Sequence, residues 1–389
     1  MKKKSIYLDN AATSFPKPES VYIAINKTMR ECYGNAGRSG HKPSQLAKNI
    51  IDETRFVCKQ LFNAETIENI IFTYNATLAL NIAIKGLLTK GDHVITSSLE
   101  HNSVSRPLHN LETKRICEIT KIHTDLIFGV CIDDIRKAVK PNTKLIICNH
   151  ISNVTGTVND VKTIGNFCRD NGLLFLVDAA QSAGSKDIDV QKMGIDLLAF
   201  PGHKGLFGPQ GTAGLYIRSG LNLNTIIEGG TGNMSETLLQ PEFMPHRFEA
   251  GTMNTPGLAG LLAGVKFILE TGISEINEYE TNLTNRLIKG LQKIEGVQLF
   301  VPSDQYVNRG NIASLIAESI PSENIMMMLD SVFNIYVRSG LHCSVDAHRT
   351  IGTLSEGGTL RISPNYFNTE IEIDDFLICF RECVDCSKM

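Results

Sequence analysis

Three consecutive segments decide the fold: LLFLVDAAQSAG (173–184), DLLAFPGHKGLFGPQG (196–211) and TAGLYIR (212–218). The apolar run of the first segment ends abruptly at Asp178, a pattern typical of a buried parallel strand. The second apolar run ends at Phe200, and Lys204 follows shortly after it. Open α/β sheets bind their ligands at the carboxyl ends of strands. The sequence therefore predicts an acid and an amine at the same edge of a sheet.

Asp178 and Lys204 together suit one cofactor, pyridoxal phosphate. Its aldehyde condenses with a lysine amine, and a carboxylate keeps its ring nitrogen protonated, so that the ring accepts electrons from a substrate carbanion. Taken singly, the acid could be a strand-end cap and the lysine a surface side chain. Their combination with Gln181 and His203 favours the cofactor site.

The segments VDAAQ, GHKG and GPQGTAGLYI resemble the class V aminotransferase group of fold-type I pyridoxal-phosphate enzymes, especially its cysteine desulfurases and selenocysteine lyases. The resemblance extends over nearly the whole chain. It implies an α/β fold in which a large cofactor-binding domain has a mostly parallel seven-stranded sheet, and a smaller α+β domain lies at the carboxyl end. The large domain would be 14–257, and the small domain 1–13 with 258–389.

Hydrophobic patterning agrees with this organisation, because strand and helix patterns alternate as in a doubly wound sheet. The expected strands of the sheet are 69–73, 93–98, 115–120, 144–149, 173–178, 196–200 and 212–218. The expected helices are 18–31, 43–62, 76–88, 161–171, 258–271 and 276–294. Short strands are expected in the small domain at 297–301, 312–316, 335–339 and 359–362.

Composition narrows the class of protein. Of the 389 residues, 42% are hydrophobic and 20% charged, which is ordinary globular composition. A formal charge of −3 indicates no basic surface for nucleic acid or for a membrane. No apolar stretch has the length of a membrane span, and no apolar region follows the basic start as in a secretion signal. We therefore expect a cytoplasmic protein without membrane or nucleic-acid partners.

The chain contains ten cysteines. In a long chain of intracellular composition they indicate thiols, not a disulfide framework. Cys379, Cys383 and Cys386 lie close together, but no second pair of ligands accompanies them. We therefore predict no metal site.

The resemblance implies how the cofactor is held. Asp178 would pair with the ring nitrogen, Gln181 with the phenolate oxygen, His203 with the phosphate and Lys204 with the aldehyde. Thr77 and the backbone N–H of Ala76 begin a helix, whose N-terminus suits a phosphate, although an ordinary helix cap explains them too. The family usually has a second hydroxyl at Ala76, and many desulfurases have a serine at Pro201.

Further matches add substrate and partner contacts. His101 resembles the histidine that stacks on the cofactor ring and moves protons, and Asn153 the residue that binds the substrate carboxylate near the ring oxygen. His41 belongs to a glycine-rich segment, Asn35-x-x-Arg38-x-x-His41, similar to one that lines the substrate opening, although a solvated loop explains it equally well. Thr252 resembles a threonine that reaches the phosphate of the neighbouring subunit, which implies a homodimer with shared active sites.

Two residues near the carboxyl end point to the reaction. Arg361 matches the small-domain arginine, and a planar guanidinium binds a carboxylate through two parallel hydrogen bonds. Cys343, in RSGLHC (338–343), resembles the desulfurase signature, with Leu341 in place of the usual first histidine. A thiol beside the imidazole of His342, in a glycine-flanked loop, can be activated as a thiolate.

The resemblance therefore implies a homodimeric cysteine desulfurase that converts L-cysteine to L-alanine. Lys204 would remove the α-proton, and Cys343 would take the sulfur as a persulfide for a sulfur-acceptor protein, for iron–sulfur clusters or other sulfur-bearing molecules. A selenocysteine lyase or another C–S lyase is the nearest alternative. A transaminase would leave Cys343 without a role. A nucleotide-binding enzyme would need the G-x-G-x-x-G fingerprint, which is missing after the first strand of the sheet. A non-catalytic homologue would not need Lys204, Asp178, Cys343 and Arg361 together.

Overall fold

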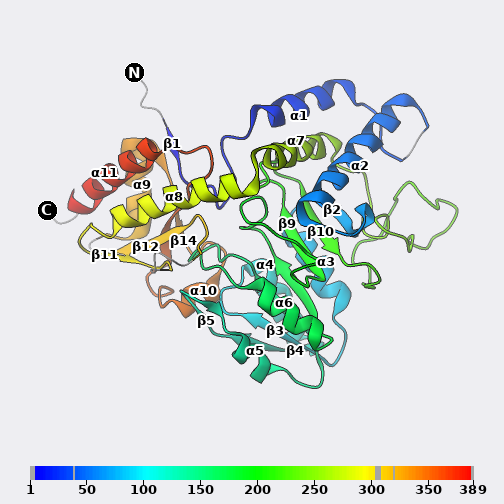
Figure 1. Ribbon diagram of the computed structural model, residues 1–389, viewed down its shortest axis with the longest axis horizontal. Coiled ribbons are helices and arrows are strands. Elements are labelled where there is room, and N and C mark those ends of the chain that lie inside the picture. Colours follow the sequence, from blue (N-terminus) through cyan, green and yellow to red (C-terminus); the bar gives the residue numbers. More distant parts are fainter. Residues whose placement is uncertain (1–4, 38–39, 303–307, 319, 387–389) are drawn as a thin grey trace.

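A seven-stranded sheet forms the centre of the computed structural model, which describes residues 5–37, 40–302, 308–318 and 320–386 (Figure 1). Its order is β2-β10-β9-β8-β7-β3-β4. β10 is antiparallel to both of its neighbours, and the other pairs are parallel, so the expected mostly parallel sheet is confirmed. The strands are β2 (Ile70–Thr73), β3 (Asp92–Ser97), β4 (Cys117–Ile122), β7 (Thr143–Asn149), β8 (Leu174–Asp178), β9 (Leu197–Pro201) and β10 (Ala213–Ile217).

Helices cover both faces of this sheet. Successive side chains of a strand point to opposite faces, so that Phe72 joins a core with α2, α6 and α7, whereas Ile71 joins a core with α3 and α4. Apolar residues on both faces explain why the sequence shows continuous apolar runs. The helices of these layers are α1 (Glu19–Glu31), α2 (Lys42–Phe62), α3 (Ala76–Leu87), α4 (Asn102–Thr113), α5 (Ile132–Ala138), α6 (Val161–Asp170) and α7 (Thr255–Thr271).

A separate core lies around an antiparallel four-stranded sheet, β11-β12-β15-β14, at the left of Figure 1. Ile6 and Leu8 pack into this core, because β1 pairs with β13. The expected strand at 335–339 is therefore split between two sheets. The elements are β1 (Ile6–Tyr7), α8 (Ile273–Leu291), β11 (Val297–Leu299), β12 (Ala313–Ala317), α9 (Ser322–Phe333), β13 (Ile335–Tyr336), β14 (Arg338–Gly340), α10 (Val345–Thr350), β15 (Thr359–Ile362) and α11 (Glu370–Cys386).

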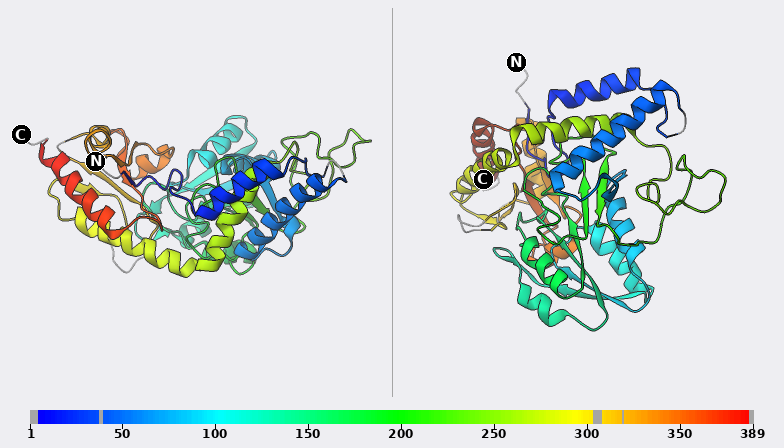
Figure 2. Two further views of the ribbon diagram at one scale, coloured as in Figure 1. Left: turned by 90° about the horizontal axis from the view of Figure 1, so that it is seen from above. Right: turned by 45° about the vertical axis from the view of Figure 1, so that its right-hand side comes forward.

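The two parts are joined through α7 and α8, which meet at an angle of 87°. Gly272 stands between them with φ of +93°, a value that favours glycine. α8 then extends toward the small sheet (Figure 2). α7 packs against α1 and α2. The division into 14–257 and 1–13 with 258–389 stays a prediction.

The remaining short elements are the 3-10 helix η1 (Ile67–Asn69) and the two-residue strands β5 (Thr124–Asp125) and β6 (Gly129–Val130). No disulfide joins the ten cysteines, all of which lie in the described ranges. In those same ranges, no single helix is long and apolar enough to cross a membrane. The bent pair α7–α8 reaches the required length and apolar composition only when its two helices are counted together.

Candidate active site

A cavity of about 240 Å³ opens at the carboxyl ends of the central strands. Asn149 ends β7, Asp178 ends β8 and Pro201 ends β9, and Asn149 is paired in register with Asp178. The strand order therefore brings together residues that are far apart in the sequence. The cavity is lined by Ala11, Ala12, Asn75, Ala76, Thr77, Leu80, His101, Ser103, Asn149, Ile151, Asn153, Asp178, Ala180, Gln181, Pro201, His203, Lys204, Arg338, His342 and Arg361.

Lys204 lies in the tight loop that follows β9. The N–H of Gly202 donates to the carbonyl of Thr212 at 2.8 Å, and a side chain at Gly202 would collide with the Thr212 hydroxyl at 2.2 Å. The loop thus requires a glycine to hold the lysine at the strand end. Burial of the amine lowers the pKa of Lys204 to about 8, with the charge of Arg361 acting in the same direction and Asp178 opposing it.

Asp178 is buried beside this amine. One carboxylate oxygen accepts a hydrogen bond from the N–H of Ala180 at 2.9 Å. Burial nevertheless raises the pKa of Asp178, because the hydrogen bond and the charge of Lys204 offset only part of the lost hydration. The buried Glu100 lies behind it, and burial raises the pKa of Glu100 to about 8. A positively charged partner would therefore stabilise the ionised carboxylate of Asp178.

Two neutral histidines face the cavity. Burial, with Lys204 next in effect, lowers the pKa values of His101 and His203 to about 4. Nδ1 of His101 accepts from the N–H of Ser103 at 3.0 Å and so caps α4. Nδ1 of His203 is buried and has no partner within the described residues. Thr77 lies at the first turn of α3, with its hydroxyl 2.7 Å from that of Ser103.

Asn153 and Arg361 are joined to each other and to neighbouring loops. Nη1 of Arg361 donates to the carbonyl of Asn153 at 3.1 Å, and Nη2 donates to Oδ1 of Asp9 at 2.7 Å. Nε of Arg361 is buried without a partner in the part of the chain that the structure describes. The side-chain amide of Asn153 is bonded to residues 342 and 344, on either side of the cysteine.

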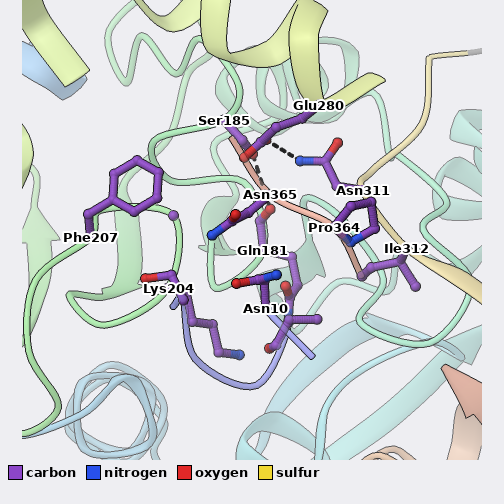
Figure 3. Close-up of a pocket in the computed structure, with 13 residues that line it drawn as sticks. Asn10, Gln181, Ser185, Lys204, Phe207, Glu280, Asn311, Ile312, Pro364 and Asn365 are labelled. Carbon is purple, nitrogen blue, oxygen red and sulfur yellow. Dashed lines mark hydrogen bonds between the residues drawn. The ribbon is translucent and has the colours of Figure 1, made fainter. Parts of the chain in front are cut away.

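A smaller cavity of about 40 Å³ adjoins this one, and Ala11, Gln181 and Lys204 line both. Nε2 of Gln181 donates to the carbonyl of Ala11 at 3.0 Å. Figure 3 shows Glu280 bonded to Asn311 at the far edge of the small cavity. Burial raises the pKa of Glu280 to about 7. The polar lining and the size of the small cavity suit ordered water.

Cys343 is exposed and lies in a groove of about 390 Å³ that shares His101 and Thr77 with the cavity. Nη2 of Arg338 is 3.7 Å from its sulfur. We expected the imidazole of His342 to activate the thiol, but Nε2 of His342 lies 3.1 Å from the carbonyl and hydroxyl oxygens of Thr359. Burial lowers the pKa of His342 to about 2, which keeps its ring neutral. A cation beside the sulfur is supplied by Arg338 instead.

Besides Cys343, which lies in the adjoining groove, two of the expected site residues lie outside this cavity. Thr252 is exposed, and its hydroxyl accepts from Nδ2 of Asn35 at 3.3 Å. His41 is also exposed, and its Nδ1 accepts from the N–H of Ser44 as the cap of α2. Ser44 in turn donates to the carbonyl of Asn35 at 2.6 Å, so these residues form one cluster. Arg38, from the same glycine-rich segment, lies outside the described residues.

The profile of the class V aminotransferases matches residues 6–376.

The chain belongs to the class V aminotransferase family.

Full-length relatives of this class V aminotransferase carry a more specific name. The chain is 35% identical to a "Probable cysteine desulfurase" of Methanothermobacter thermautotrophicus, over 95% of this chain and 92% of that protein. It is also 35% identical to a "Probable cysteine desulfurase" of Pyrococcus abyssi, covering 97% and 94%. The structure matches the apo cysteine desulfurase of Thermococcus onnurineus with a TM-score of 0.92 and 33% identity, covering 98% of this chain and 95% of that one.

Two residues of this class V aminotransferase site had no role in the sequence interpretation. Asp9 pairs with Arg361, and Arg338 contacts Cys343. Arg338 begins the RSGLHC segment that the sequence interpretation singled out, whereas Asp9 lies outside the segments discussed there. Which side chain turns inward depends on contacts that only the folded chain provides.

Proposed function

We propose that this class V aminotransferase is a pyridoxal-phosphate-dependent cysteine desulfurase that converts L-cysteine to L-alanine and keeps the sulfur as a persulfide on Cys343. The observation that carries the proposal is an exposed thiol, in contact with a guanidinium, in the groove that adjoins the cavity of Lys204. A transaminase has no use for such a thiol. The names of the relatives support the same activity.

The residues of the cavity fit pyridoxal phosphate. Asp178 is a buried carboxylate that forms no ion pair of 4 Å or less with a described residue, which suits a protonated ring nitrogen. The buried Nδ1 of His203, which lacks a partner among described residues, and the N-terminus of α3 suit the phosphate. His101 would lie against the ring, and Gln181 would approach its phenolate oxygen. When bound, the cofactor supplies an electron sink for the carbanion formed at the substrate Cα.

The chain's own residues bind the substrate and move its protons. Arg361 would hold the carboxylate, because its guanidinium is buried and its Nε has no partner among the residues described. Lys204 would take the α-proton, since a lowered amine pKa leaves a larger share of the free base near neutral pH. The Cys343 thiolate would then form an S–S bond as the Cβ–S bond breaks. The electron pair of that bond stays with the carbon fragment, which is protonated and leaves as alanine.

Replacing Arg361 with lysine is expected to raise KM for L-cysteine by roughly tenfold or more, because an ammonium cannot form two parallel hydrogen bonds to a carboxylate. Steady-state kinetics would measure this, with the exposed Arg349→Lys as the control. An unchanged KM in a folded Arg361→Lys enzyme would remove Arg361 from the substrate site.

Acetylation of Lys204 in the enzyme without bound cofactor is expected to accelerate as pH rises, with a midpoint near 8. The sign follows from the lowered pKa: below pH 8 the amine is protonated and inert, and above it the free base reacts. Mass spectrometry of acetylated peptides would follow the reaction, with the exposed Lys192 as an internal reference. A midpoint equal to that of Lys192 would show that burial does not tune this amine.

A homodimer is part of the proposal. The long loop between β10 and α7 extends from the body beside α2 in Figures 1 and 2. Several apolar side chains of this loop, of α1 and of the segment that follows α1 are exposed, and exposed apolar patches mark interaction sites. They include Tyr22, Ile23, Met29, Tyr33, Ile227, Leu238, Leu239 and Phe243. Thr252 and His41, both outside their own cavity, would then serve the partner's site.

Alanine and sulfide release from L-cysteine, in the presence of a dithiol reductant, tests the proposal. The dithiol is needed because it reduces the persulfide and releases sulfide. Equal amounts of both products are expected. Conversion of 2-oxo acids to amino acids with no sulfide would indicate a transaminase, whereas activity confined to selenocysteine would indicate a selenocysteine lyase.

A further inference from the structure

The backbone around Cys343 has an unusual conformation. His342 has φ of +48° and Cys343 has φ of +58°. Both values lie in the left-handed region, which residues with a side chain adopt infrequently and at an energetic cost. Two consecutive residues keep such a conformation only when surrounding contacts hold them. The contacts around this bend therefore fix the position of the thiol.

The N–H of Ser344 donates to the carbonyl of Leu341 at 2.9 Å and closes the bend. Three further hydrogen bonds hold it from outside. Nδ2 of Asn153 donates to the carbonyl of His342 at 2.7 Å, and the hydroxyl of Ser344 donates to Oδ1 of the same amide at 2.8 Å. The carbonyl of Cys343 accepts from the N–H of Asn102 at 2.7 Å. The side-chain amide of Asn153 is thus hydrogen-bonded to the chain on both sides of the cysteine.

Asn153 is itself well anchored. It lies in a turn in which the N–H of Ser152 bonds to the carbonyl of Thr157 at 2.9 Å, and the N–H of Gly156 to that of Ser152 at 3.0 Å. Its own carbonyl accepts from Arg361. The amide is therefore a fixed point between the substrate-binding arginine and the cysteine loop.

The hydroxyl of Ser344 makes no hydrogen bond to any described residue other than Asn153. Serine at the start of a helix usually caps the helix with its side chain. Ser344 precedes α10, yet its side chain makes no capping bond there. The residue is completely buried, and its hydroxyl is directed to Asn153 instead.

We propose that Ser344 is a positioning residue, which acts with Asn153 to hold the strained bend so that Cys343 stays within reach of the substrate sulfur. The inference rests on the proposed function, because it concerns the sulfur-transfer step of that reaction. The expected role of Asn153 at the substrate carboxylate stays a prediction, since only one N–H of its amide nitrogen donates to the cysteine loop.

Ser344→Ala tests this inference with two substrates. L-Cysteine needs the thiol of Cys343, whereas β-chloroalanine loses chloride without a nucleophile and needs only the rest of the site. We expect kcat for L-cysteine to fall about tenfold and KM to change by less than about twofold, because one positioning hydrogen bond is lost. Elimination from β-chloroalanine should change by less than about twofold. Equal losses with both substrates would overturn the inference, and so would unchanged kinetics.

Alkylation of Cys343 provides a readout that is independent of activity. The Cys343 peptide is followed by mass spectrometry during reaction with iodoacetamide, and its rate should change several-fold in Ser344→Ala as the loop loosens. The matched control is Thr350→Val, which removes a hydroxyl at the other end of α10 without touching Asn153. An unchanged alkylation rate would overturn the inference. A wild-type enzyme inactive on L-cysteine would refute the proposed function alone, because the alkylation comparison still tests the bend.

Discussion

Alanine formation from L-cysteine falls by about 10³-fold or more when Cys343 is replaced by alanine, because the substrate sulfur then has no nucleophile to accept it. Elimination from β-chloroalanine persists in the same variant, since that reaction needs no thiol. Measuring both products with one enzyme preparation separates the loss of sulfur transfer from a loss of folding or of cofactor.

Cys131→Ala is the matched control for this prediction. Cys131 is also exposed, but it lies before α5 and lines none of the active-site cavities described above. Its replacement should leave alanine formation within about twofold, as expected of a surface substitution. Alanine formation at the wild-type rate in Cys343→Ala would show that the sulfur leaves without help from this thiol. The selenocysteine-lyase or C–S lyase interpretation would then replace the desulfurase.

Lys204→Ala is expected to lower turnover of both L-cysteine and β-chloroalanine by about 10⁴-fold, because the variant lacks the amine that removes the α-proton. The effect differs from that of Cys343→Ala, which spares β-chloroalanine. Initial rates with both substrates, measured with saturating cofactor, distinguish the two variants.

Added methylamine supplies a free base of small size and should restore part of the β-chloroalanine activity of Lys204→Ala. Lys192→Ala serves as the control, because its side chain is 79% exposed and lies away from the cavity. Full activity of Lys204→Ala without added amine would contradict the role of this lysine as base.

The sheet and its site could be predicted because their signals are local. An apolar run that ends at Asp178 and a glycine-bounded Lys204 specify strand ends, and parallel strands place their ends at one edge. The strand order, the cavity and the proximity of these two residues agree with that expectation. Burial of both faces made each strand a continuous apolar run, which short amphipathic strands would not show.

The environment of Cys343 could not be predicted in the same way. The sequence places His342 next to the thiol, but a left-handed bend turns the chain, and Nε2 of His342 bonds to Thr359. Arg338 lies beside the sulfur instead. The pairing of β14 with β15 aligns residue 338 with residue 361 of the cavity. Pairings across a sheet and positive φ values at residues other than glycine leave no periodic signal in the sequence.

The mass of the Cys343 peptide after reaction with L-cysteine tests the central claim most directly. The enzyme is mixed with L-cysteine in the absence of reductant, alkylated with iodoacetamide and digested. The account predicts a Cys343 peptide that is heavier than the ordinary alkylated peptide by one sulfur atom, formed in step with alanine. Alanine formed while Cys343 carries no additional sulfur, or additional sulfur on Cys131 or Cys386 instead, would contradict it.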